Sequence, residues 1–197
     1  MPHTIYGLPT HVLLIHVVVV LIPLGALFTV LSAVWPAARR KLGFISPLTC
    51  AIALVFVPIT TNAGHWLQNK IDPNHANQAI DKHANLASNY LFFAIGLFVI
   101  SAAVWAVGRR FEFAVPRPAG RRASPNGTQQ PVNGAGGGVS TATATRTQAQ
   151  ATRTALPVWA SSLLIGAAVL MSLLAVWQLY RIGDAGAHAV WDGIVSR

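Results

Sequence analysis

The chain has 197 residues, of which 53% are hydrophobic and only 10% are charged, and its mean hydropathy is +0.51. A soluble domain carries about 25% charged residues, so this composition excludes an ordinary soluble protein and indicates a membrane protein. The net charge of +9 does not indicate nucleic-acid binding, because the basic residues lie between apolar segments, where they encode membrane topology. Cys50 is the only cysteine, which excludes an intrachain disulfide and a cysteine-based zinc or iron–sulfur site.

The first apolar segment predicts a membrane-spanning helix over about residues 11–35. Pro9 and Thr10 precede it and suit a helix N-terminus, while Pro23 predicts a kink. About 25 residues extend about 37 Å, which is enough to cross a hydrocarbon core of about 30 Å with some tilt. The residues before this segment include no Lys or Arg, so we expect a retained span and not a cleaved signal peptide.

Three later segments predict further spans over about residues 46–69, 83–108 and 157–180, and the loop between the second and third spans is hydrophilic. Short connections between successive spans predict an all-α membrane protein whose four helices form an antiparallel bundle. Residues 1–110 therefore hold the first three spans. We find no convincing internal repeat in the sequence.

The chain after the third span divides into two segments of different composition. Residues 111–155 are rich in Pro, Gly, Ser and Thr and lack apolar periodicity, so they predict a disordered basic linker on the cytoplasmic side. Residues 156–197 hold the fourth span and a tail, in which Val190 and Trp191 would share one side of a short helix on the outer membrane surface.

The basic residues divide unevenly between the two sides of the predicted membrane protein. Ten follow the first and third spans, and four lie on the opposite side: Lys70, Lys82, Arg181 and Arg197. The positive-inside rule assigns the richer side to the cytoplasm. We therefore predict a multi-pass protein of the bacterial cytoplasmic (inner) membrane with both termini outside.

All seven histidines fall on the predicted outer side or in the outer half of a span: His3, His11, His16, His65, His75, His83 and His188. An ionisable or ligating side chain inside an apolar span is costly, and it therefore suggests a functional site. His11 and His16 are about 140° apart around a helix, so they face different neighbours.

Two kinds of site are compatible with this pattern. The first is a b-type haem held by imidazoles from two helices, for which we prefer His16 and His83. The second is a copper or zinc site built from His11, His16 and His83, with His65 and Asp184 as accessory residues.

A structural alternative stays open beside both sites. The histidines of the helix ends would then only form hydrogen bonds across the bundle or dock a partner, as in a non-catalytic membrane subunit. We expect no catalytic activity of the chain itself. The expected partners are the lipid bilayer and a redox partner protein or a second copy of the chain, but no nucleic acid.

Several short patterns of the chain resemble a bacterial family of predicted membrane proteins, domain of unknown function 2231, in its actinobacterial type. The matching residues are Gly7, Leu8, Pro9, His11 and His16 at the first span, Ala63, Gly64, Trp66 and Leu67 at the end of the second, His83 at the third, and Gly183, Asp184, Gly186, Ala187, Ala189, Val190 and Trp191 in the tail. His65 and His188 depart from the family pattern. The resemblance implies a four-span membrane protein, and fusions of related domains to Rieske-type iron–sulfur domains imply electron transfer.

Overall fold

The computed structural model describes residues 4–5, 7–111, 113 and 156–195, so almost all of the predicted linker lies outside the described residues. A short antiparallel pair of strands, β1 (Thr4–Ile5) and β2 (Leu8–Pro9), precedes the helices. The helices are α1 (Thr10–Val34), α2 (Pro36–Leu42), α3 (Ile45–Ile71), α4 (Gln78–Ser88), α5 (Tyr90–Arg110) and α6 (Val158–Val195).

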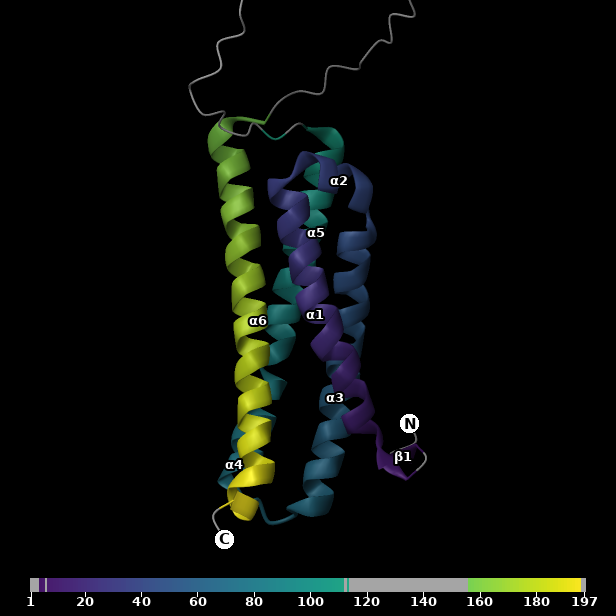
Figure 1. Cartoon of the computed structure of the whole chain (residues 1–197), viewed down its shortest axis with the longest axis vertical. Coiled ribbons are helices and arrows are strands. Elements are labelled where there is room, and N and C mark those ends of the chain that lie inside the picture. Colours follow the sequence, from purple (N-terminus) through teal and green to yellow (C-terminus); the bar gives the residue numbers. More distant parts are fainter. Residues whose placement is uncertain (1–3, 6, 112, 114–155, 196–197) are drawn as a thin grey trace, which may run out of the picture.

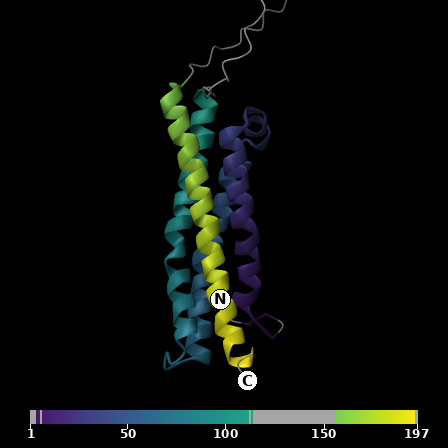
Figure 2. The same cartoon turned by 60° about the vertical axis from the view of Figure 1, so that its left-hand side comes forward.

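Four helical segments are long and apolar enough to cross a membrane: Thr10–Val34, Ile45–Ile71, Gln78–Arg110 and Val158–Trp191. This confirms the predicted all-α class with four candidate spans, as expected of a multi-pass membrane protein. The long helices lie side by side, and the N and C marks lie toward the same end (Figure 1). Figure 2 shows α6 between α1 on one side and α4 and α5 on the other.

Two helices extend beyond their predicted bounds. The third candidate span begins at Gln78 and not near residue 83, because the Asn77 side chain accepts hydrogen bonds from the N–H groups of Ala79 and Ile80 and caps α4. The fourth does not end near residue 180. Instead, α6 continues through Val195, where a separate surface helix was predicted, and Ile182 and Gly186 in this continuation contact His83 of α4.

The structure reveals an internal repeat that sequence reasoning missed. Several residues that are buried in α1 have a counterpart in α5 that is also buried and that always lies the same number of positions later in the sequence. These pairs are Val18 and Tyr90, Ile22 and Ala94, Gly25 and Leu97, Thr29 and Ser101, and Ser32 and Val104. Buried positions of α3 likewise recur on α6: Ser46 and Ala168, Cys50 and Ser172, Ala53 and Ala175. Helix α1 packs against α3 and α6, and α5 also packs against α3 and α6. We therefore describe two related halves, α1–α3 and α4–α6.

Small and hydroxyl side chains let the helices approach closely, both within each half and between the halves. Ser46 Oγ lies 2.9 Å from Ser101 Oγ, and Thr29 donates a hydrogen bond to the Gly25 carbonyl at 2.7 Å. A Cβ atom on Gly25 would lie 2.9 Å from Cys50 Sγ, and one on Gly96 would lie 2.7 Å from the Met171 Cε atom. These contacts fix the rotation of each helix about its own axis, and this rotation decides which side chains face the cavity described next.

Candidate functional site

A cavity of about 460 Å³ lies between the two halves, toward the end of the helices where the chain termini lie. Its walls come from α1, α3, α4 and α6, together with Tyr90 at the start of α5, and are mainly apolar. The few polar side chains in the lining include His11, His65 and His83. An apolar pocket with a small number of convergent polar groups is the usual form of a ligand site.

His11 enters the cavity from the first turn of α1 and is half-buried. Its Nδ1–H donates a hydrogen bond of 2.9 Å to the carbonyl oxygen of Thr60 on α3. One turn further along α3, Gly64 lies against the ring, since a Cβ atom there would come within 2.8 Å of His11 Cε1. Because a carbonyl only accepts, Nδ1 carries the proton and Nε2 keeps its lone pair.

His83 has a matching environment on the other half. Its Nδ1–H donates a hydrogen bond of 2.9 Å to the carbonyl oxygen of Ile182 on α6. Gly186 follows one turn later, and a Cβ atom there would lie 3.0 Å from His83 Nδ1. His11 and His83 are thus related by the same sequence separation as the buried positions of α1 and α5.

The two imidazoles meet across the cavity. Their ring centroids are 6.5 Å apart, and their planes stand at 86° to each other. One ring is held by the α1–α3 half and the other by the α4–α6 half. The arrangement therefore brings two imidazoles from opposite halves together in one apolar cavity, each held through its Nδ1 by a main-chain carbonyl.

His16 does not belong to this arrangement. Its side chain is exposed, its Nδ1–H donates to the Val12 carbonyl of its own helix at 2.7 Å, and it is absent from the cavity lining. The structure therefore does not bring His16 next to His83, as the preferred haem pair required, and His11 occupies that place. The reason is the angle between His11 and His16 around α1, which lets only one of them face inward.

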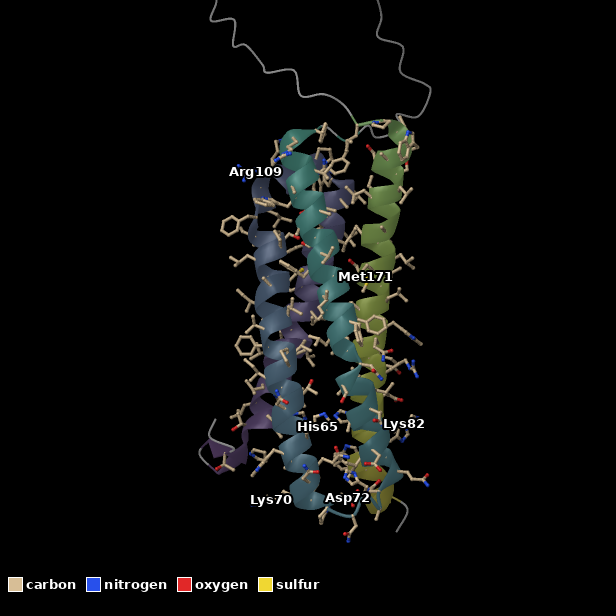
Figure 3. The ribbon with its side chains drawn as sticks, turned by 180° about the vertical axis from the view of Figure 1, so that it is seen from behind. His65, Lys70, Asp72, Lys82, Arg109 and Met171 are labelled. Carbon is tan, nitrogen blue, oxygen red and sulfur yellow. The ribbon has the colours of Figure 1, made fainter. Side chains whose placement is uncertain are left out.

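Of the two predicted accessory residues, His65 lies at the cavity and Asp184 does not. His65, labelled in Figure 3, lines the cavity. Its Nε2 lies 3.1 Å from Ser88 Oγ on α4. Asp184 is exposed and lies 3.9 Å from His188 on α6, outside the cavity lining. In the described part of the chain, no group of three or more His, Cys, Asp or Glu residues is arranged to hold a metal ion. The predicted three-imidazole copper or zinc site is therefore not supported.

A polar loop closes the end of the molecule beside the cavity. Asp72 accepts hydrogen bonds from the N–H groups of Ala76 and Asn77 at 3.0 and 2.9 Å. Next to it, Asp81 lies 2.9 Å from His75 Nδ1 and accepts a hydrogen bond from Gln68. The hydrogen bond to Asp81 raises the pKa of His75 above its usual value. These contacts tie α3 to α4 next to the cavity.

Sequence reasoning missed the groups that position the two imidazoles. Two of these groups are main-chain carbonyls, which leave no residue-type signal, and the other two are Gly64 and Gly186, which sequence reasoning named only as part of the family resemblance. A signal did exist, because both glycines follow an alanine near one end of a long apolar segment: Ala63–Gly64 and Ala185–Gly186.

Comparisons of the chain with protein-family models, with curated proteins and with solved structures find no match.

Proposed function

We propose that the cavity binds a b-type haem, whose iron His11 and His83 would hold, and that the protein is a membrane electron-transfer module. The observation that carries this proposal is the pair of opposed imidazoles, each with Nδ1–H donated to a main-chain carbonyl. Histidines that bind metals usually donate their other ring N–H to a carbonyl or carboxylate, which fixes the tautomer and the ring orientation.

The spacing of the rings supports the same proposal. A bond between a metal and an imidazole nitrogen is about 2 Å long, so two imidazoles on opposite sides of one metal ion have centroids about 6 Å apart. The observed separation is 6.5 Å. The two ligands would come from different helices, as in other haem-binding helical bundles. A haem needs two protein ligands, so the absence of a three-ligand group among the described residues does not bear on it.

The cavity also suits a large apolar group. Its volume of about 460 Å³ falls within the common range for ligand pockets, about 300–1,000 Å³. Valine, leucine, isoleucine and alanine side chains from both halves dominate its walls. When bound, a haem supplies a one-electron redox couple, and the protein holds the iron, orients the two imidazoles and keeps water out.

The optical spectrum of the full chain purified in mild detergent tests this proposal. We expect a Soret band that shifts on reduction with dithionite, and we expect His11→Ala and His83→Ala each to abolish low-spin haem binding. His16→Ala is the matched control, since His16 is a histidine of the same helix outside the cavity, and it should keep the band. A protein that stays colourless after addition of haemin would overturn the proposal and leave the histidines with a structural role.

We further propose that the four long helices form an antiparallel bundle in a bacterial inner membrane, with the cavity at the outer face. In support, Arg109 lies at one end of the molecule, and Lys70, Asp72 and Lys82 lie at the other (Figure 3). The richer basic end then faces the cytoplasm. A reporter active only in the cytoplasm should work when inserted in the region 134–138 and fail at the C-terminus, and the opposite result would reverse the orientation.

The resemblance to domain of unknown function 2231 is likewise a proposal. The family pattern includes four spans and both His11 and His83, and the fusions of related domains to Rieske-type domains suggest an electron-transfer partner. A redox protein on the outer side would be the natural partner of a haem held there.

A further inference from the structure

Helix α2 lies across the axis of the bundle at the end away from the cavity, where it joins α1 to α3 (Figure 2). It carries Arg39, Arg40 and Lys41 in its last turn. Arg39 faces the bundle, since its guanidinium donates hydrogen bonds of 2.7 Å to two carbonyls at the end of α1 and lies 3.6 Å from the centroid of the Phe113 ring. Its aliphatic part also lies against Gly108 of α5. These contacts fix the position of α2 and its rotation about its own axis.

The two cations that follow Arg39 are left without a partner. Successive residues of a helix are turned by about 100°, so Arg40 and Lys41 cannot face the bundle as Arg39 does. Both are exposed, and neither forms a hydrogen bond or an ion pair with any residue that the structure describes. Arg109 and Arg110 complete the basic residues of this end, where they close α5 (Figure 3). The basic charge of the end is therefore fixed in place by Arg39 and exposed on α2.

The chain itself supplies little negative charge to this end. Four of its five acidic residues belong to α4, to the loop before it and to the last turns of α6, at the cavity end: Asp72, Asp81, Asp184 and Asp192. The fifth, Glu112, lies outside the described residues, and residues 114–155 include no Asp or Glu. A second copy of the chain in the same orientation would present the same basic end. An anion that neutralises Arg40 and Lys41 therefore comes from another molecule.

The surface next to these cations is apolar. Trp35, which directly precedes α2, is 59% exposed, and Phe44, which directly follows Gly43 at the end of α2, is 58% exposed. Leu48, one turn after Phe44, is 43% exposed, and its N–H donates to the Phe44 carbonyl at 3.0 Å. The start of the candidate span α3 thus continues the surface as an apolar strip. A molecule that joins an anionic group to an apolar chain matches both parts of this surface, whereas a soluble anion matches only the first.

We propose that Arg40 and Lys41 bind the phosphodiester headgroup of an anionic phospholipid, while its acyl chains lie along Phe44 and Leu48. Lys and Arg residues that directly flank a membrane span attract anionic lipids, with about 1 kcal/mol for each residue near the surface. Tryptophan is enriched at the level of the headgroups, which is the level that Trp35 would mark beside α2. The proposal rests on the proposed insertion of the long helices in a membrane and is independent of the haem.

Native mass spectrometry of the full chain in a mild non-ionic detergent measures this binding. The probes are phosphatidylglycerol and phosphatidylcholine with the same acyl chains, so that only the headgroup differs. We expect phosphatidylglycerol to bind about thirtyfold more tightly, which corresponds to about 1 kcal/mol for each of the two cations. The double variant Arg40→Gln with Lys41→Gln should lose most of this preference, because both charges that face the headgroup are removed.

Two further variants control for net charge and for folding. Lys70→Gln with Lys82→Gln removes the same charge from the other end of the molecule and should keep the preference (Figure 3). The exchange Arg40→Lys with Lys41→Arg keeps both charges on α2 and should also keep it. Equal binding of the two lipids by the unchanged protein, or an equal loss in both glutamine variants, would overturn the proposal. Displacement of phosphatidylglycerol by an equal concentration of glycerol 3-phosphate would also overturn it, since a free anion would then be the ligand.

Discussion

The imidazole planes of His11 and His83 are nearly perpendicular, at 86°, with their centroids 6.5 Å apart. Each ring is held in this orientation by a carbonyl and a glycine of the neighbouring long helix. Neither ring can turn freely without losing its hydrogen bond or meeting the glycine backbone. The relative orientation of the two rings is therefore a property of the fold that a spectroscopic experiment can detect.

If both imidazoles bind one haem iron, their perpendicular planes should give a strongly anisotropic low-spin ferric signal. Electron paramagnetic resonance of the oxidised protein measures this directly. A rhombic low-spin signal, which is typical of parallel imidazole planes, would contradict the orientation seen here. A high-spin signal alone would show that only one of the two histidines is bound.

The glycines beside the imidazoles provide a second prediction. Alanine at position 186 would place Cβ 3.0 Å from His83 Nδ1, and alanine at position 64 would place Cβ 2.8 Å from His11 Cε1. Gly186→Ala or Gly64→Ala should therefore displace the ring and weaken haem binding at least tenfold. Gly166→Ala is the matched control, because Gly166 lies on α6 outside the cavity lining and its Cβ would meet nothing within 4 Å. Haemin titration measures the affinity, and equal affinities for all three variants would refute the role of these glycines.

The ion pair of the polar loop should make that loop sensitive to pH. Asp81 raises the pKa of His75 in the folded protein, so the folded state favours the protonated ring. The resulting stabilisation is complete below the unfolded pKa of about 6.5 and is lost as the pH rises through the higher folded value. Hydrogen exchange of residues 72–77, corrected for the intrinsic effect of pH, should show more protection at about pH 6 than at about pH 8. Asp81→Asn should remove this difference, and its persistence in the variant would assign the effect to another group.

Arg39 should stabilise the end of the bundle that lies away from the cavity and the polar loop. Its guanidinium donates hydrogen bonds of 2.7 Å to the carbonyls of Ser32 and Ala33, which are left unpaired at the end of α1. Arg39→Ala should lower the free energy of unfolding by about 2 kcal/mol, because these are charge-assisted bonds to partly buried groups. Arg40→Ala removes the same charge from the neighbouring position and should have a much smaller effect. Unfolding in a mixed-detergent titration compares the two variants, and equal losses would mean that net charge, and not the hydrogen bonds, is responsible.

The sequence alone determined the class of the protein and the approximate positions of its long helices. Hydropathy and segment length are local properties, so the four apolar segments could be recognised without knowing what they pack against. The predicted bounds of a helix differed from the observed bounds where tertiary contacts extend the helix. The residues after position 180 are glycine-rich and polar enough to suggest a separate tail, whereas in the structure they continue α6 and contact His83 of α4 at Ile182 and Gly186.

Only the tertiary structure decided which histidines meet. The pattern of His11 and His16 on one helix showed that they face different directions, but the rotation of α1 depends on contacts such as Gly25 with Cys50, which join distant parts of the chain. That rotation turns His11 toward His83 and leaves His16 exposed and outside the cavity lining. The internal repeat could not be recognised from the sequence for the same reason. Its two halves share buried positions and backbone contacts more than residue types, and these contacts join segments that are far apart in the chain.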